Sequence, residues 1–347
     1  MALTKVLQKY FSNIFISIIH QDNEWIITSK VVRNGVIKDK FIENFESDGR
    51  DNIPSKMEKY LEKLQTEYNF AYIAVFLDSM GQGAISGISA TDFQKNSVDM
   101  KSVTHINIDK NWVVYASFID INWIKNLFKN SGVDFIYSPF IVQNSLIKKQ
   151  TPREQPTLYI LNHNDSVTIS IFENGNILFG AYFQTTTDDK IGGEEDWENE
   201  SEEEGLDDLI ELDNMGDDDI GGLDELDDLG DLDDLEENED AEGFEEVKEK
   251  DKDLGHFSSG EEQVESNLEL FGRDILIYKY LTSSLKEFYK NPLYKSNFIE
   301  KIIIYDGYEV SNELIDMIEN DLLMDIEMHK INISEIVCDI SIKEALK

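Results

Sequence analysis

Cysteine, proline and cationic side chains are scarce in this sequence. The single cysteine, Cys338, excludes disulfides within the chain and fits a reducing compartment. It lies in an apolar run, so we expect a buried structural thiol rather than a nucleophile. Lys and Arg number 31 against 71 Asp and Glu, which gives a net charge of −40. Nucleic acids and anionic lipid surfaces would repel such a protein, so we expect neither as a partner.

Long hydrophobic runs are also missing near the start of the chain. The apolar stretch Tyr10–Ile19 contains Ser12, Asn13 and Ser17 and is too short to span a bilayer. No small-residue cleavage pattern follows it, so it predicts a β-strand rather than a signal peptide. We therefore expect a cytoplasmic protein.

What the chain has in excess is acid, and most of it lies in one segment. Residues 188–253 hold 34 Asp and Glu against four Lys, a net charge of −30. We assign 188–257 to an insertion that interrupts the fold, because so charged a segment cannot bury a core of its own. Within it, leucines recur every three residues, at Leu223, Leu226, Leu229, Leu232 and Leu235.

Three interpretations of this acidic insertion remain open. A helix would spread the five leucines around its surface, so the first interpretation is a solvated, disordered loop. The second is an acidic bait whose leucines bind a basic and apolar groove on a partner. The third is calcium binding, but the ligand pattern of a calcium loop is not matched, so the affinity would be weak.

The first 150 residues predict a mixed α/β unit. Runs of β-branched and aromatic residues predict strands, and Asn34-Gly35 is a hairpin signal between the second and the third. Residues 78–99 are rich in Gly and Ser and predict a loop, because the glycines at 81, 83 and 87 miss the spacing of a dinucleotide-binding turn. The predicted strands are Ile14–His20, Trp25–Val32, Ile37–Phe45, Ala71–Leu77, Trp112–Phe118 and Val133–Tyr137, and the predicted helices are Pro54–Tyr68, one capped by Asp120, and Pro139–Lys149.

The same order restarts after a linker, Thr151–Pro156. The predicted strands of this half are Leu158–Asn162, Val167–Phe172, Ile177–Phe183, Lys301–Tyr305 and Ile331–Val337, and its helices are Glu261–Tyr289 and Ser311–Leu323. Each half thus has a three-stranded meander followed by helix, strand, helix and strand, which predicts a mixed sheet covered by helices. We expect two lobes of one duplicated unit, one over 1–150 and one over 151–187 and 258–347, on either side of a cleft.

This doubled βββαβαβ order resembles the two-lobed actin and sugar-kinase ATPase fold, whose unit is ribonuclease H-like. Within that fold, the chain resembles the PilM-like proteins of type IV pilus assembly and the cytoplasmic domain of the type II secretion protein GspL. Thr157–Gly175 looks like the second phosphate hairpin of this family, Ser283–Tyr289 like its helix before the adenosine strand, and Lys301–Gly307 like that strand and its glycine turn. In the first half, Trp112–Lys149 has the order of elements of the family.

The resemblance implies a nucleotide site, but this chain departs from the pattern. Such a site needs glycine-rich turns that let backbone amides approach phosphate, and an acidic residue that manages Mg²⁺. The hairpins His20–Trp25 and Asn162–Ser166 contain no glycine, so we expect no cofactor. If ATP and Mg²⁺ do bind, the resemblance assigns them to Asp22, Asp165, Ser166 and Gly307, which otherwise serve as ordinary turn residues. No histidine spacing predicts a metal site, and no Ser-His-Asp set predicts a catalytic one.

The resemblance also implies a function, that of a cytoplasmic scaffold without catalytic activity, attached to the inner membrane through its partners. It would bind the short cytoplasmic tail of a bitopic inner-membrane protein, as an extended peptide in a groove of the first lobe. The machine would be a type IV pilus, a type II secretion or competence system, or a flagellar motor. The acidic insertion would contact other subunits, and a homo-oligomer or ring is a further expectation. An active ATPase of the same machine and a free acidic adaptor are the alternatives.

Overall fold

The first half of the chain begins with the predicted meander. The computed structural model describes residues 11–47, 49–185, 259–294 and 296–346. Its first three strands are antiparallel: β1 (Asn13–Gln21), β2 (Glu24–Arg33) and β3 (Val36–Glu46). Asp22 and Asn23 in the first turn, and Asn34 and Gly35 in the second, have positive φ, as two-residue turns between twisted strands require.

A parallel strand and two helices extend this first sheet. α2 (Ser55–Glu67) leads to β4 (Phe70–Phe76), which runs parallel to β1. α4 (Phe118–Leu127), β8 (Phe135–Tyr137) and α5 (Pro139–Ile147) follow later in the chain. The order of strands is β3-β2-β1-β4-β8. Met57, Leu61 and Leu64 line one face of α2 and are buried in the core beside this sheet.

A small sheet is inserted between β4 and α4, and of its three strands the sequence predicted only the one at Trp112–Phe118. It consists of β5 (Gln82–Ser86), β6 (Val103–Ile108) and β7 (Trp112–Ser117) in the order β5-β7-β6, with α3 (Ala90–Lys95) after β5. The predicted loop over 78–99 is therefore wrong. The glycines are there for packing, because a Cβ on Gly83 would lie 2.6 Å from Cζ of Tyr115.

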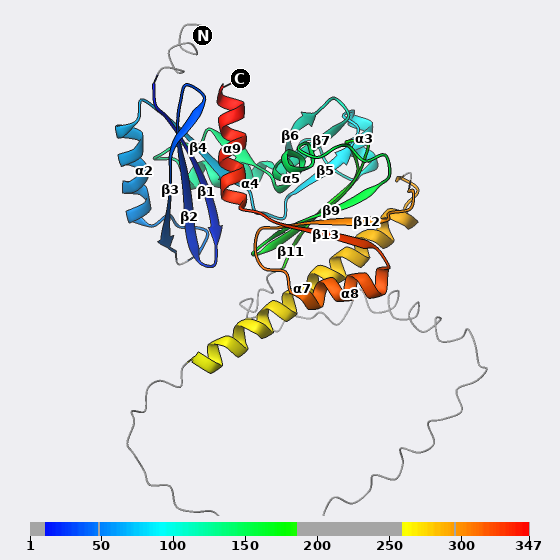
Figure 1. Cartoon of the computed structure of the whole chain (residues 1–347). Coiled ribbons are helices and arrows are strands. Elements are labelled where there is room, and N and C mark those ends of the chain that lie inside the picture. Colours follow the sequence, from blue (N-terminus) through cyan, green and yellow to red (C-terminus); the bar gives the residue numbers. More distant parts are fainter. Residues whose placement is uncertain (1–10, 48, 186–258, 295, 347) are drawn as a thin grey trace, which may run out of the picture. The chain divides into compact units, whose positions relative to one another are not determined.

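The second half repeats the topology of the first. β9 (Thr157–His163), β10 (Ser166–Glu173) and β11 (Asn176–Gln184) form the meander, and α7 (Ser259–Lys290), β12 (Lys301–Asp306), α8 (Asn312–Leu322), β13 (Asp325–Lys330) and α9 (Ile333–Leu346) follow (Figure 1). The order β11-β10-β9-β12-β13 matches that of the first sheet, and β12 is parallel to β9 as β4 is to β1. The predicted class is confirmed: a two-lobed, actin-like α/β fold made of a duplicated βββαβαβ unit.

Two details of the predicted elements are wrong. Ser117, not Asp120, caps α4, because its hydroxyl accepts a hydrogen bond from the Ile119 amide (3.1 Å). Asp120 instead accepts one from Ser79 Oγ (2.8 Å). The last predicted strand, Ile331–Val337, lies mostly in α9. β13 precedes it and is rich in charged residues because it is an edge strand, so the apolar run pointed to the wrong segment.

The last helix, α9, packs on the first sheet although it follows the second one in sequence. It contacts β1, β2 and β4. Lys30 of β2 is buried, and its Nζ lies 2.6 Å from Oδ1 of Asp339. Ser17 Oγ of β1 lies 2.8 Å from Oγ of Ser334. These polar contacts fix the position of α9 on the first lobe.

Cys338 lies in the same interface, in a buried cluster with Phe15 and Val32. Its Sγ donates a hydrogen bond to the carbonyl oxygen of Phe15 (3.2 Å). Burial raises the pKa of the thiol to about 12. The thiol is therefore protonated at neutral pH, which agrees with the structural role predicted for it.

α5 makes the reciprocal crossing onto the second sheet. It contacts β9 and β10, and Gln143 Nε2 donates to the carbonyl oxygen of Tyr159 (3.0 Å). Ser170 Oγ in turn donates to Gln143 Oε1 (2.6 Å). Each sheet is thus covered by a helix from the other half of the chain: α9 packs on the first sheet and α5 on the second. Both halves belong to one compact unit.

The acidic insertion predicted over 188–257, with its five leucines, lies outside the described residues. Within the part of the chain that the structure describes, no helix combines the length and the apolar character needed to cross a bilayer.

Replacing Asp339 by Ala is expected to lower the free energy of unfolding by about 1 kcal/mol. Lys30, with a side chain 5% exposed, would keep only Glu335, whose carboxylate lies at 3.8 Å and whose carbonyl oxygen lies at 3.3 Å. Urea denaturation followed by circular dichroism measures the change. Asp316→Ala on the exposed side of α8 is the control, and an equal loss in both variants would contradict the anchoring role of Asp339.

Candidate functional site

The carboxyl ends of the parallel strands bring charged residues of both lobes together. β1 and β4 run parallel in one sheet, and β9 and β12 in the other. Asp22 follows β1, Asp78 comes two residues after β4, and Asp165 lies in the turn after β9. In α/β sheets, ligands bind at this end of the strands. The four residues predicted for a nucleotide all lie at these ends, and two arginines that were not predicted lie among them.

Arg50 joins the two lobes through one guanidinium. Nη1 donates to the carbonyl oxygen of Asp78 (3.0 Å), and Nη2 donates to its Oδ2 (3.0 Å). Nη2 also donates to Oδ2 of Asp165, in the β9–β10 turn. The exposed fractions of the side chains are 27% for Arg50, 9% for Asp78 and 15% for Asp165. A planar, permanently charged donor fits two carboxylates at once, so we call this contact the Arg50 bridge.

Asp78 is the most deeply buried member of the Arg50 bridge. Nδ1 of His163 lies 3.5 Å from its Oδ2, and Oη of Tyr182 donates to its Oδ1. Burial alone would raise the pKa of Asp78, but His163 and Arg50 lower it more, so the net shift is downward. Burial and the charge of Asp78 raise the pKa of Tyr182, so its phenol stays protonated and remains a donor.

A second arginine, Arg273 of α7, holds the β9–β10 turn from the other side. It donates to the side chain of Asn162, to the carbonyl oxygen of His163 (2.7 Å) and to that of Asn164 (2.9 Å). Its guanidinium lies over the ring of Tyr308, 4.8 Å from the centroid. Burial is the largest cause of the lowered pKa of Arg273. Every one of these acceptors is part of the protein, so the role seen for Arg273 is structural.

The four predicted residues take clear places in this arrangement. Asp22 Oδ1 accepts from Oη of Tyr308 (3.2 Å), and Asp165 accepts from Arg50. Ser166 is buried at the start of β10 and favours the charged form of Asp78. A Cβ on Gly307 would lie 2.5 Å from Cδ1 of Ile333 and 2.9 Å from the carbonyl oxygen of Asn162. The space beside Gly307 is therefore filled by the protein itself.

Sequence reasoning missed the side chains that hold the site together. These are Arg50, Asp78, Tyr182 and Arg273. One signal was available in the sequence: arginine occurs only at positions 33, 50, 153 and 273. In so acidic a chain, each of these arginines is a candidate for an ion pair with a carboxylate. Asp78 also directly follows the apolar run predicted as a buried strand, where functional residues of such sheets lie.

A comparison with known families found a match that covers most of the second half of the chain. Residues 158–346 match the family model described as Domain of unknown function (DUF8341). The chain belongs to the DUF8341 family. Residues 11–144 match a second model, Domain of unknown function (DUF8569). No curated protein matches the sequence.

Solved structures similar to this DUF8341 chain share its fold class at low identity. A Bacteroides thetaiotaomicron protein with an actin-like ATPase fold and unknown function is 9% identical, over 96% of this chain and 97% of that one, with a TM-score of 0.45. A PilM–PilN type IV pilus biogenesis complex is 8% identical over the same shares, with a TM-score of 0.48. EutJ from Carboxydothermus hydrogenoformans is 8% identical over 99% and 94%, with a TM-score of 0.39. The fold assignment of this chain therefore rests on its two matching sheet topologies.

The residues of this DUF8341 site do not fit Mg²⁺ and ATP. Among the described residues, no three His, Cys, Asp or Glu side chains are placed to hold a metal ion. Both arginines already donate to protein acceptors, and the β1–β2 and β9–β10 turns contain no glycine. A triphosphate would meet the carboxylates of Asp22, Asp78 and Asp165, whose charges repel it.

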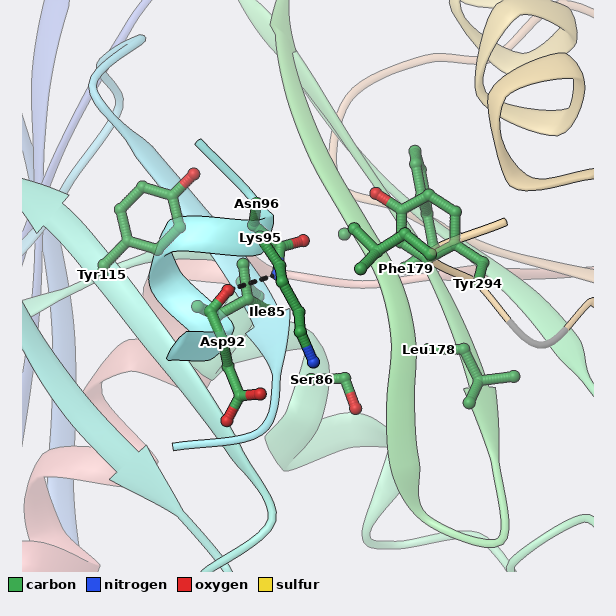
Figure 2. Close-up of a pocket in the computed structure, with 12 residues that line it drawn as sticks. Ile85, Ser86, Asp92, Lys95, Asn96, Tyr115, Leu178, Phe179 and Tyr294 are labelled. Carbon is green, nitrogen blue, oxygen red and sulfur yellow. Dashed lines mark hydrogen bonds between the residues drawn. The ribbon is translucent and has the colours of Figure 1, made fainter. Parts of the chain in front are cut away.

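A separate cavity of about 270 Å³ lies between the small sheet and β11. Figure 2 shows Asp92, Lys95 and Tyr115 on one side of it, and Leu178 and Phe179 of β11 on the other. None of the four residues predicted for a nucleotide lines this cavity. It is therefore distinct from the Arg50 bridge.

Replacing Arg50 by Met is expected to lower the free energy of unfolding by about 3 kcal/mol, because Asp78 would remain buried without its cation. Guanidinium-chloride denaturation measures the loss. Arg33→Met, at an exposed position at the end of β2, is the control and should change stability by less than about 0.5 kcal/mol. If the two variants behave alike, the Arg50 bridge does not stabilise the fold.

Asp78 should also make stability depend on acid. Because its pKa is lower in the folded than in the unfolded chain, the unfolded chain binds more protons between the two values. The stabilisation is complete above the unfolded pKa of about 4 and is lost as the pH falls below it. Urea denaturation between about pH 5 and pH 2.5 should show a shallower decline for Asp78→Asn than for the wild type. Asp316→Asn, on the exposed side of α8, is the control, and a steeper decline in Asp78→Asn would contradict the assignment.

Proposed function

We propose that this chain is an actin-like scaffold without ATPase activity. The observation that supports it most directly is the Arg50 bridge, in which a cation of the chain itself contacts Asp165 in the β9–β10 turn, one of the two turns in which the resemblance expects phosphates. The crossing helices α5 and α9 already connect the lobes, and Arg50 adds a further link through Asp78 and Asp165. The lobes then keep one relative position without a nucleotide.

The scaffold would act within a larger machine of the cell envelope. We infer a PilM-like or GspL-like role in an envelope-spanning machine: a type IV pilus, a type II secretion or competence system, or a flagellar motor. The segments Thr157–Gly175, Ser283–Tyr289 and Lys301–Gly307 carry this resemblance. The protein would lie on the cytoplasmic side of the inner membrane and attach to it through a partner.

The partner in this proposal is the short cytoplasmic tail of a bitopic membrane protein. Tails next to the cytoplasmic face of a membrane are rich in Lys and Arg, and a chain with a net charge of −40 attracts them. Attraction of this kind speeds encounter and weakens as salt rises. A specific apolar contact must then hold the tail in place.

The first lobe offers an apolar surface for that contact, which we call the α4 patch. Its members are exposed: Met80 by 60%, Met100 by 37%, Phe118 by 51% and Ile119 by 78%. Hydrogen bonds hold their segments together, because the Phe118 amide donates to Ser102 and the Ser117 amide donates to Gly81. Flexible Met beside aromatic side chains suits a peptide site. We propose that the tail binds here as an extended peptide.

The acidic insertion would contact other subunits of the machine. Leu223, Leu226, Leu229, Leu232 and Leu235 would enter apolar grooves while the surrounding carboxylates meet basic residues. This part of the proposal concerns residues outside the described structure and is supported by sequence pattern alone.

Thermal shift with Mg-ATP separates the scaffold from an active ATPase. A bound ligand at a hundred times its dissociation constant would stabilise the fold by about 2.7 kcal/mol. We expect no Mg-ATP-dependent rise in the melting temperature of the full chain. A clear rise that disappears in Asp165→Asn would instead favour the ATPase.

Ile119→Asp should weaken binding of a fluorescently labelled tail peptide at least about tenfold, which corresponds to about 1.4 kcal/mol. The negative charge would stand in the middle of the α4 patch. Leu323→Asp, at an apolar residue of the second lobe that is 86% exposed, is the matched control. Equal binding by both variants, with no loss relative to the wild type, would mean that the peptide follows overall charge and does not use the patch. Loss of membrane association when the bitopic partner is deleted would also argue against a free acidic adaptor.

A further inference from the structure

β3 is an exposed edge strand with apolar side chains. It ends the order β3-β2-β1-β4-β8, and in the described part of the chain it pairs only with β2. Its residues are exposed or half-exposed along its whole length, and Val36, Ile37 and Ile42 are exposed by 53%, 49% and 47%. A long edge of this kind is a template for pairing with another strand.

The backbone of β3 presents its free groups at alternate residues. The Ser47 amide donates to the carbonyl oxygen of Asn23 (2.8 Å), toward β2. Because the direction alternates along an antiparallel strand, the groups of Lys40, Ile42 and Asn44 point away from β2. The regular register runs back to Asp39, where a bulge at Lys38 interrupts it. The available segment is therefore Asp39–Glu46, with Lys38 at its end.

The charges along β3 decide which strand fits this edge. Suppose that a second copy of β3 pairs antiparallel with the first about a two-fold axis. The residue on the axis then determines which residues of the two copies lie opposite each other. An axis at Asp39, Lys40 or Glu43 places that charge opposite its own copy. An axis at Phe41 places Asp39 opposite Glu43 twice. An axis at residue 38 or before, or at residue 44 or beyond, leaves more than half of β3 without a partner.

An axis at Ile42 avoids all of these repulsions. Ile42 then faces its own copy, Lys40 faces Asn44, and Lys38 faces Glu46 once at each end of the ladder. Ile42 is also one of the residues whose backbone groups point outward, so the central pair can exchange both hydrogen bonds. Opposite charges in such pairs stabilise a sheet, and like charges weaken it.

We propose that two copies of this chain join through β3, antiparallel and with Ile42 on the two-fold axis, so that one sheet continues across both copies. Lys40 reaches Glu335 of α9 within its own chain, so Ile42 and Lys40 lie on the α9 side of this sheet. Phe45 lies on the other side, where its ring is 5.5 Å from that of Tyr60 in α2. The pairing is independent of nucleotide and of the tail peptide.

Sedimentation equilibrium of the full chain tests the interface. We expect a dimer whose dissociation constant rises at least tenfold in Ile42→Asp, which would place two carboxylates opposite each other on the axis. Ile106→Asp is the matched control, because Ile106 is an exposed isoleucine on β6, an edge strand of the small sheet. A wild type that is monomeric at every concentration overturns the proposal, and so does an equal effect of both variants.

Two further experiments test the register. Lys38→Glu and Glu46→Lys should each weaken the dimer, and the double variant should restore it, because the charges of the pair are then exchanged. Ile42→Cys should form a disulfide with its own copy under mild oxidation, while Asp39→Cys, far from the axis, should not. The buried Cys338 should not interfere. A double variant that stays weak, or cross-linking by Asp39→Cys alone, overturns the register.

Measuring tail-peptide binding distinguishes two occupants of the β3 edge, the peptide and a second copy of the chain. If the wild type and Ile42→Asp are both monomeric but the variant binds the tail peptide more weakly, the β3 edge binds that peptide. The dimer is then overturned. If the dimer forms and the α4 patch fails to bind the peptide, the proposed partner is wrong and the dimer stands.

Discussion

A guanidinium held between two carboxylates connects the lobes of this molecule. Arg50 follows the first meander, Asp78 follows the parallel strand of the same lobe, and Asp165 belongs to the turn of the other lobe. Ions taken out of water lose hydration, so the arrangement is stable only because each charge meets a partner at hydrogen-bond distance. Tyr182 and His163 complete the surroundings of Asp78, and Arg273 keeps the opposite turn in shape. The relative position of the lobes thus depends on residues that the chain always carries.

This has a direct bearing on function. A lobe contact made by an exchangeable ligand can be broken by hydrolysis and release, whereas a contact made by a side chain has no such cycle. A scaffold needs the second behaviour, because its partners must find the same surface at all times. The α4 patch and the β3 edge both lie on the first lobe, so a tail and a second copy could be bound by the same rigid element.

Local sequence signals predicted much of the fold. Asn34-Gly35 and the polar turn after β1 marked hairpins that the positive φ angles confirm, and the buried strands were visible as apolar runs. The third strand of the small sheet was predicted at Trp112–Phe118, but its first strand was missed because a glycine in it packs against Tyr115, a contact that sequence does not display. The last strand was misplaced because an edge strand rich in charge, β13, precedes a helix rich in apolar residues.

The site was only half visible for a related reason. The turn positions of Asp22, Asp165, Ser166 and Gly307 follow from the order of elements, so the sequence could place them. The Arg50 bridge depends on residues 115 positions apart in the chain, and no local pattern pairs them. Gly307 shows the limit of such a signal, since a glycine needed for close packing against Ile333 has the same appearance in sequence as one that admits a ligand.

The crossing of α9 has a consequence for how the protein is made. On the ribosome, β1, β2 and β4 emerge early, while the helix that covers one of their faces is synthesised after everything else described here. Until then, apolar groups around Phe15 and Val32 have no cover. The packing of the first lobe is therefore complete only once α9 has been synthesised.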